Sequence, residues 1–128
     1  MLYNVFAISV GAVFGALSRY GIFLCFENRH LGFPYHTLIV NLLGCFAIGV
    51  LFQIFSTKSD VSAILKLFLI TGFLGSFTTF SSFVADGGVL LKQEEIFKTF
   101  LYVSFSVFGG FICFFIAIYL VNFFLKHL

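Results

Sequence analysis

The most informative stretch of the chain reads TGFLGSFTTFSSF from residue 71 to residue 83. It lies within an apolar run at residues 64–91, which would be about 42 Å long as one α-helix at about 1.5 Å per residue. The hydrocarbon core of a bilayer is only about 30 Å thick, so the run has room for an interruption. The small and hydroxyl-bearing residues at 75–79 would lie near mid-membrane. Composition favours a helix broken there; a continuous helix that tolerates a patch of small residues is the alternative.

A break at this depth would have two chemical consequences. Backbone carbonyls freed from the helix can bind a cation, and the new helix N-terminus carries a positive dipole end. Directly after the cluster, Phe80 and Phe83 are three residues apart and share one face of a helix. Because an aromatic ring has a positive edge, two rings presented edge-on could contact an anion stripped of water. Simple packing against lipid is the alternative for these two rings.

The composition of the whole chain places this stretch in a membrane. Of 128 residues, 61% are hydrophobic, 9% are charged and one is proline, whereas soluble domains have about 45–50% apolar and about 25% charged residues. So few charges cannot cover a water-soluble surface, and membrane lipid is the expected solvent. The net charge of +2 is also too small for a surface that tracks phosphates, so no nucleic-acid partner is expected.

Four apolar runs are long enough to cross a bilayer as helices, which requires about 20 residues. These runs are expected to form helices at residues 5–26, 35–55, 64–91 and 97–125. The connectors between them are short and carry almost all the charge. The chain is therefore predicted to be an all-α membrane protein, with residues 1–128 forming a single domain of four transmembrane helices.

Positive charge is divided evenly across the membrane. The side with the termini carries Lys58, Lys66 and Lys126, and the other carries Arg29, Lys92 and Lys98, with Arg19 in addition if it snorkels. Lysine and arginine bias sets orientation, so an even division leaves two alternatives. One is a weak topology that a partner fixes; the other, which we favour, is insertion in both orientations followed by assembly as an antiparallel homodimer. Four helices can hardly enclose a hydrophilic pathway alone, and two-fold pairing is the commonest form of oligomer.

Polar side chains inside the spans are costly in lipid and indicate a pathway or a helix contact. Arg19, near the end of the first span, is either a snorkelling anchor or a vestibule charge that attracts anions. Asn41, in the second span, is either a contact between helices or a hydrogen-bond donor to an anion. Gly11 and Gly15, four residues apart, are expected to form a close helix contact.

Hydroxyl groups extend this polar set toward the last helix. Ser81 and Ser82 lie beside the two phenylalanines, while Tyr102, Ser106 and Gly110 follow one another at helical spacing in the fourth span. Together with the ring edges they predict a track of hydrogen-bond donors, without the acidic ring that would favour cations.

No arrangement of residues supports an enzyme. The sequence has no metal-ligand spacing of His and Cys, no nucleophile paired with a base and no phosphate-binding loop. The cysteines lie inside apolar runs and are expected to be buried thiols rather than disulfides: Cys25, Cys45 and Cys113. The histidines lie at span ends and are expected to be interfacial: His30, His36 and His127.

The chain resembles the small fluoride-channel family CrcB/Fluc along its whole length. The first span carries Gly-x-x-x-Gly-Ala-x-x-Arg, in Gly11, Gly15, Ala16 and Arg19. The second carries Pro-x-x-Thr-Leu-x-Val-Asn-x-x-Gly, in Pro34, Thr37, Leu38, Val40, Asn41 and Gly44. The third carries the long and specific motif Gly-Phe-x-Gly-x-x-Thr-Thr-Phe-Ser-x-Phe, in residues 72–83.

This resemblance implies a passive, fluoride-selective channel that exports fluoride across a bacterial-type inner membrane. It implies a dual-topology antiparallel homodimer with two pores and a central structural sodium ion. The pore would be lined by Phe80, Phe83, Asn41, Ser81, Ser82, Tyr102 and Ser106. Arg19 would lie at the vestibule, and the backbone carbonyls of Gly75 and Thr78 would bind the sodium.

Four positions depart from the family pattern. His36 stands where glycine is usual, Ser76 replaces a common second glycine, Asp86 stands where glutamate is more common, and Gly110 stands where some members have a hydroxyl. The alternative function is a small dual-topology multidrug or cation exporter coupled to protons. Such an exporter needs a titratable carboxylate in the middle of a span, and the one buried candidate, Asp86, lies near the end of the third span.

Overall fold

A computed structural model describes the chain at residues 1–26, 32–58 and 60–127. Arg29 and His30, named above, lie outside these ranges. The regular elements within them are all helical: α1 (Leu2–Phe26), α2 (Tyr35–Thr57), α3 (Ala63–Lys66), the π-helix η1 (Leu67–Leu74), α4 (Gly75–Phe77), α5 (Phe80–Lys92) and α6 (Ile96–His127).

Four helical segments are long and apolar enough to cross a membrane: Leu2–Phe26, Tyr35–Thr57, Ala63–Lys92 and Ile96–His127. The four predicted spans are thereby confirmed as helices. The helices run slightly past the predicted ends because polar residues that flank an apolar run can continue its hydrogen bonding. Ser62 shows how one of them begins, since its side chain accepts from the N–H of Leu65 at 3.2 Å and caps α3.

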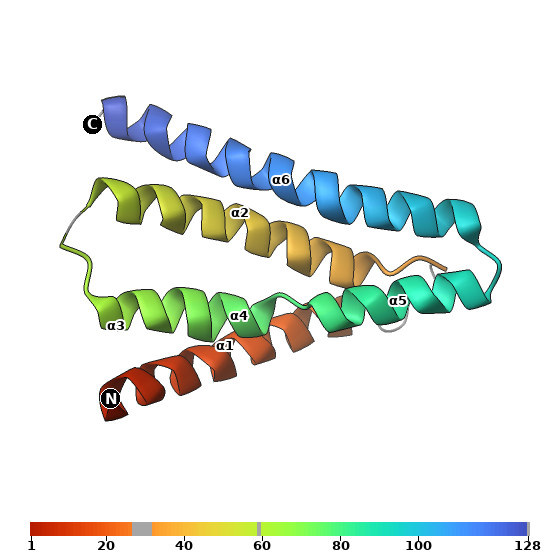
Figure 1. The fold of residues 1–128 in the computed structure, drawn as a ribbon, viewed down its shortest axis with the longest axis horizontal. Helices are drawn as coiled ribbons and strands as arrows, with labels where there is room; N and C mark the ends of the chain where they lie inside the picture. Colours follow the sequence, from red (N-terminus) through yellow and green to blue (C-terminus); the bar gives the residue numbers. More distant parts are fainter. Residues whose placement is uncertain (27–31, 59, 128) are drawn as a thin grey trace.

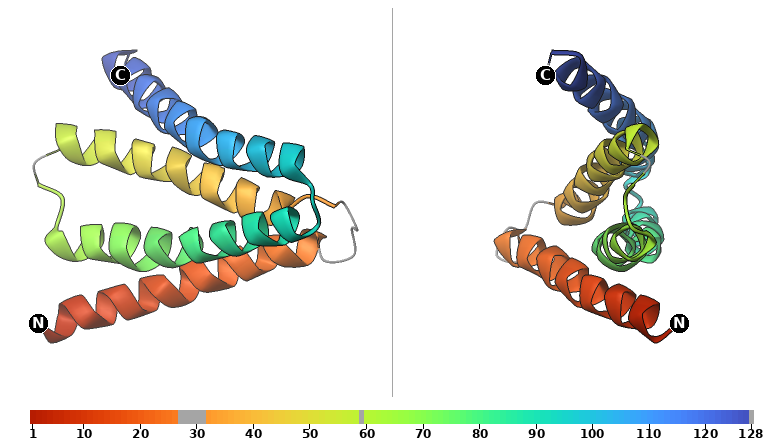
Figure 2. Two further views of the ribbon diagram at one scale, coloured as in Figure 1. Left: turned by 45° about the vertical axis from the view of Figure 1, so that its right-hand side comes forward. Right: turned by 90° about the vertical axis from the view of Figure 1, so that its left-hand side faces the viewer.

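The four spans lie side by side (Figure 1). The third span, made of α3, η1, α4 and α5, packs against α1 through η1 and α4, and α6 packs along α2. The N- and C-termini lie at the same end of the molecule, as an even number of spans requires. Figure 2 shows that α1 and α6, the two outermost helices, are inclined to the helices beside them.

Glycines allow α1 to approach the third span closely. A Cβ atom at Gly11 would collide with the carbonyl oxygen of Phe68, and one at Gly15 would collide with that of Phe73. Gly72 faces α1 in turn, where a Cβ atom would lie 2.7 Å from the carbonyl oxygen of Ile8. The predicted close helix contact through Gly11 and Gly15 is confirmed.

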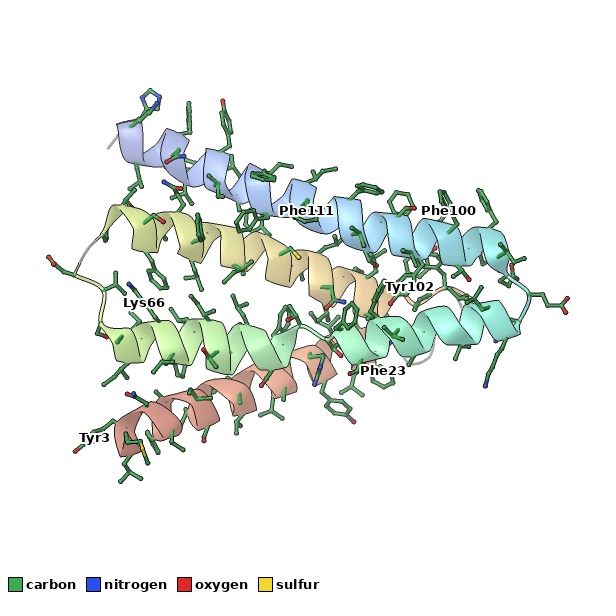
Figure 3. All side chains as sticks on the ribbon, in the orientation of Figure 1. Tyr3, Phe23, Lys66, Phe100, Tyr102 and Phe111 are labelled. Carbon is green, nitrogen blue, oxygen red and sulfur yellow. The ribbon has the colours of Figure 1, made fainter. Side chains whose placement is uncertain are left out.

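Most of the apolar surface is open in the single subunit. The buried cluster is small and consists of Val40, Leu74 and Phe77. Phe100, by contrast, is 66% exposed and lies on the outer side of α6, away from α2 (Figure 3). Because apolar surface of this extent is stable in lipid and not in water, the fold fits a multi-pass membrane protein.

The cysteines are free, as predicted, but they are less buried than predicted. Cys45 and Cys113 are half-buried, and Cys25 is exposed. The prediction of burial was wrong for Cys25 because a position inside an apolar run does not determine which face of the helix it occupies. Its thiol bonds back to the carbonyl of Gly21 at 3.4 Å, one turn earlier in α1.

Candidate functional site

The third span is interrupted between α4 and α5, at Thr78 and Thr79. Thr78 has φ −79° and ψ 157°, and Thr79 has φ −150° and ψ 115°, so both residues are extended. The chain becomes helical again at Phe80 and continues in much the same direction (Figure 1). Two extended residues leave peptide groups without helical partners, and in apolar surroundings these groups must be satisfied by other parts of the protein.

Asn41 of α2 supplies the partners of Thr79. Its Nδ2 donates to the Thr79 carbonyl oxygen at 3.1 Å, and its Oδ1 accepts from the Thr79 N–H at 2.9 Å. One carboxamide thereby satisfies both backbone groups of a residue that is only 9% exposed. Asn41 is therefore a contact between helices, and because Nδ2 carries two hydrogens, one of them remains for another acceptor.

Hydroxyl groups fix the start of α5. Thr79 is its N-cap: Oγ1 accepts from the N–H of Ser82 at 3.2 Å and donates to Ser82 Oγ at 3.0 Å. Ser81 Oγ lies 3.4 Å from the same threonine oxygen. On the other side of the interruption, Thr78 Oγ1 donates to the carbonyl of Leu74 at 2.9 Å. The predicted polar residues Asn41, Ser81 and Ser82 therefore meet around Thr79.

The same hydrogen bonds leave two carbonyls without their helical donors. In a continuous α-helix, the N–H of Thr79 would bond to the carbonyl of Gly75, and the N–H of Ser82 would bond to that of Thr78. Here these two N–H groups donate to Asn41 and to the Thr79 hydroxyl. The described residues contain no group of three or more His, Cys, Asp or Glu that could hold a metal. The oxygen atoms at this part of the chain are backbone carbonyls and the side-chain oxygens of Asn41, Thr78 and Thr79.

Three aromatic rings from α5 and α6 form a row beside the interruption. The ring centroids of Phe80 and Phe83 are 5.6 Å apart with planes tilted by 41°, and those of Phe83 and Tyr102 are 5.2 Å apart with planes tilted by 42°. Tyr102 is fully buried, whereas Phe80 is 77% exposed. Figure 3 shows Tyr102 directed from α6 into the space beside α5. The row therefore runs from the interior of the subunit to its surface.

A carboxylate joins the inner end of this row to α2. Asp86 Oδ2 accepts from Thr37 Oγ1 at 2.6 Å and from the Tyr102 hydroxyl at 3.3 Å. Thr37 is 2% exposed and Tyr102 is 0% exposed, so the carboxylate satisfies two hydroxyls that water does not reach. Asp86 therefore contacts the predicted track through Tyr102.

Arg19 lines a cavity of about 470 Å³ that leads to this cluster. The polar or ionisable residues lining it come from α1, α2, the interruption and α5: Arg19, Tyr20, His36, Thr37, Thr79, Ser82 and Asp86. Arg19 makes no ion pair within the part of the chain that the structure describes. Its predicted vestibule position thus coincides with a cavity that carries both signs of charge.

Two further cavities open beside α2. One, of about 370 Å³, is lined by Asn41, Gly44, Thr78, Thr79 and Phe80, among other residues. The other, of about 410 Å³, includes Ser106, whose Oγ is buried without a hydrogen-bond partner in the structure. Ser106 lies one helical turn after Tyr102 and outside the hydrogen-bonded cluster around Asp86. Within the described residues, no hydrogen bond joins its hydroxyl to the groups around Thr79 or Asp86.

Sequence reasoning missed two features of the site. It placed Thr79 in the hydroxyl-bearing cluster at 75–79 but did not predict that this residue is both the N-cap of α5 and the partner of Asn41. It also did not predict that Thr37 and Tyr102 share Asp86. A signal for the second was present, because Thr37 precedes Asn41 by four residues and Asp86 follows Phe83 by three, which places each pair on one helix face.

Comparison with known proteins places this geometry in context. The family described as CrcB-like protein, Camphor Resistance (CrcB), matches residues 6–118. A protein of Chlorobium luteolum named fluoride-specific ion channel FluC is 38% identical over 115 residues, which cover 90% of this chain and 89% of that protein. A protein of the same name from Chlorobium phaeobacteroides is 43% identical over 106 residues, which cover 83% of each chain. Another from Chloroflexus aurantiacus is 42% identical over 116 residues, which cover 90% of this chain and 92% of that protein.

Proposed function

This chain belongs to the CrcB-like family, and from that premise we propose that it is a fluoride-selective channel that exports fluoride passively from the cytoplasm. The predicted family resemblance is thereby confirmed. The observation that carries the proposal is its similarity, at about 40% identity over most of the chain, to proteins named fluoride-specific ion channels. Exporting fluoride would relieve its toxicity. The protein would do so as a multi-pass protein of the inner membrane.

The site supports the proposal chemically. Fluoride is small and strongly hydrated, so a pore must replace its water with several donors that each bind weakly enough to release it. The positive charge of Arg19 would attract the anion into the vestibule. The remaining hydrogen of Asn41 Nδ2, the hydroxyls of Ser81 and Ser82, and the ring edges of Phe80 and Phe83 would then replace its water. Tyr102 and Ser106 would extend the track along α6.

The open face of the subunit supports assembly as an antiparallel, dual-topology homodimer. Phe80 is 77% exposed although it lies next to the polar interruption, and it lines a cavity together with Asn41. A second copy, inverted in the membrane, would cover this face and complete two pores. The even division of Lys and Arg is consistent with insertion in both orientations.

A structural sodium ion at the dimer centre would be bound by backbone carbonyls. Gly75 and Thr78 suit this role because the N–H groups that would normally occupy their carbonyls donate elsewhere. Carbonyl oxygens released from a helix are suitable ligands for a hard monovalent cation near the middle of a membrane. The ion would hold the two interrupted spans together, and the interruption would lie near mid-membrane.

The proton-coupled exporter has weaker support. Its required carboxylate would be Asp86, which is hydrogen-bonded to Thr37 and Tyr102. None of the relatives described above carries the name of an exporter of drugs or cations.

The export function is tested in cells. A bacterial strain without its own fluoride exporters, expressing this protein, should grow at fluoride concentrations that stop the parent strain. The matched control is Phe100→Ile, which alters an exposed phenylalanine on the outer side of α6 and should preserve growth. Failure of the wild-type protein to restore growth, when immunoblotting shows the protein in the membrane fraction, would contradict the proposal.

A further inference from the structure

The third span contains a π-helix, η1, shortly before the interruption. π-Helical turns are rare and occur frequently at functional sites. In such a turn an N–H bonds to the carbonyl five residues earlier instead of four, and the Gly75 N–H accordingly reaches the carbonyl of Ile70. The α-helical spacing has returned by Thr78, whose N–H donates to the carbonyl of Leu74 at 3.0 Å. The change of spacing therefore lies between these two hydrogen bonds.

This change of spacing leaves one carbonyl over. Three carbonyls, those of residues 71–73, lie between the acceptors Ile70 and Leu74, whereas two N–H groups, those of residues 76 and 77, lie between the two donors. At α-helical spacing these two N–H groups donate to the carbonyls of residues 72 and 73. The Gly75 N–H also reaches those two carbonyls, but not that of Thr71. The carbonyl without a helical donor is therefore that of Thr71.

The side chain of Thr71 lies on the open face of the subunit. Thr71 in η1 and Gly75 in α4, four positions apart, are both exposed. The hydroxyl of Thr71 makes no hydrogen bond within the described residues, whereas that of Thr78 donates to the carbonyl of Leu74. Two oxygen atoms of one residue thus lack partners inside a membrane span, where lipid offers none.

These oxygen atoms lie one helical turn from the proposed sodium ligands. Residues four apart on a helix are about 5–6 Å apart, and helix carbonyls point toward the C-terminal end, so the carbonyl of Thr71 points toward Gly75. The third span begins at the end of the molecule that holds both termini (Figure 1), and Thr71 therefore lies between that end and the interruption. Because an ion at this depth must exchange its water for protein oxygens, oxygens at an intermediate depth lower the barrier to its passage.

We propose that Thr71 is an entry ligand for a hard monovalent cation, whose hydroxyl and free carbonyl hold the ion transiently as it moves to or from the carbonyls of Gly75 and Thr78. This inference rests on the sodium site of the proposed function and adds a route to it. In the antiparallel dimer proposed above, the two copies of Thr71 would lie on opposite sides of the ion, one toward each surface of the membrane. A residue that lowers the barrier without contacting the bound ion accelerates binding and release equally and leaves the affinity unchanged.

The test is the exchange of radioactive sodium. Purified protein in detergent, equilibrated with the labelled ion, is mixed with excess unlabelled sodium, and the label that it retains is followed over time. Thr71→Val, which removes the hydroxyl at nearly constant volume, should slow release by at least about tenfold, the effect expected for loss of one polar contact to an ion. Its equilibrium affinity for sodium should stay within about twofold of that of the wild type.

Two further variants show whether the hydroxyl itself is responsible. Thr71→Ser keeps the hydroxyl and should release sodium at the wild-type rate. Thr57→Val is the matched control, because Thr57 is also exposed and its hydroxyl donates to the carbonyls of Gln53 and Ile54 within α2. It should also release sodium at the wild-type rate. Equal slowing in Thr57→Val and Thr71→Val would overturn this inference.

Release from Thr71→Val as fast as from the wild type would overturn it as well, and so would faster release with weaker binding, since Thr71 would then be a ligand of the bound ion. If Thr71→Val does not fold, Thr71→Ala lacks the same hydroxyl and carries the same prediction. A wild-type protein that releases fluoride from vesicles but retains no sodium would overturn the sodium site and this inference, and leave the channel function intact. A wild-type protein that retains sodium but releases no fluoride would overturn the channel function and leave this inference standing.

Discussion

Gly44 of α2 lies directly against the side chain of Thr78, so that a Cβ atom at position 44 would collide with Thr78 Cγ2. The contact joins α2 to the interruption of the third span, one helical turn from the hydrogen bonds between Asn41 and Thr79. We therefore expect Gly44→Ala to displace Thr78 and to lower the free energy of unfolding by about 1–3 kcal/mol, the usual cost of overpacking.

The double variant Gly44→Ala/Thr78→Ser tests this explanation, because serine keeps the hydroxyl and lacks the methyl group that collides. Thermal unfolding in detergent should show that the second change restores most of the lost stability. Gly21→Ala is the control, since a Cβ atom there would meet nothing within 4 Å. Equal destabilisation by Gly44→Ala with and without the threonine change would contradict the steric argument.

Asn41 should be needed for both stability and conduction. Asn41→Ala would leave the N–H and carbonyl of Thr79 without partners, and each unsatisfied buried group costs about 1–3 kcal/mol. The stability against unfolding in detergent and the rate of fluoride release from vesicles should both fall. Gln53→Ala is the matched control, because it also removes a carboxamide from α2. The Nε2 of Gln53 donates to Asn122 Oδ1 of α6 at 2.7 Å, away from Thr79. A variant at Gln53 that lost fluoride release as completely would show that the position of Asn41 is not special.

The two phenylalanines at the start of α5 should be required for flux rather than for folding. Phe80→Ile and Phe83→Ile keep an apolar side chain and remove the positive ring edge. Each should reduce fluoride release by at least about tenfold, which corresponds to about 1.4 kcal/mol. Phe108→Ile, at a position on α6 that is 68% exposed, is the control. Normal flux in both Phe80→Ile and Phe83→Ile would show that these two rings do not contact fluoride in the pore.

Asp86 should act as a hydrogen-bond acceptor and not as a proton carrier. Asp86→Asn retains a carbonyl oxygen for Thr37 and Tyr102, so fluoride release should stay within about threefold of wild type, a change below about 0.7 kcal/mol. Asp86→Ala would leave both hydroxyls without their acceptor and should destabilise the protein. Vesicles with and without a proton gradient distinguish the functions: flux that requires the gradient and is lost in Asp86→Asn would favour the proton-coupled exporter.

Local sequence patterns were sufficient for the spans and for one helix contact. Apolar length and the glycine spacing in the first span depend on one helix at a time. The sequence therefore predicted a helix at residues 5–26, which forms over Leu2–Phe26, and the close approach at Gly11 and Gly15. The exposure of Cys25 could not be predicted in this way, because the orientation of a helix in lipid depends on what packs around it. Around Cys25 the run GIFLCF is apolar on every face, so its composition does not indicate which face packs inward.

The sequence indicated which polar side chains are costly in lipid, but not the hydrogen bonds that join them. The sequence identified Asn41 as costly in lipid, yet its partner is the backbone of a residue 38 positions away. Similarly, the hydroxyl of Thr37 meets Asp86 across 49 positions of sequence. Such pairings arise from the packing of α2 against the third span, which no local pattern records.

Fluoride release from vesicles containing the purified wild-type protein tests the central claim most directly. Vesicles loaded with equal concentrations of potassium fluoride and potassium chloride are diluted into a medium free of both anions. The ionophore valinomycin lets potassium leave to balance the charge, and ion-selective electrodes follow the two anions. We predict rapid fluoride release with chloride retained at the level of protein-free vesicles. Chloride release as fast as fluoride release, or fluoride release no faster than from protein-free vesicles, would contradict the assignment of this chain as a fluoride-selective channel.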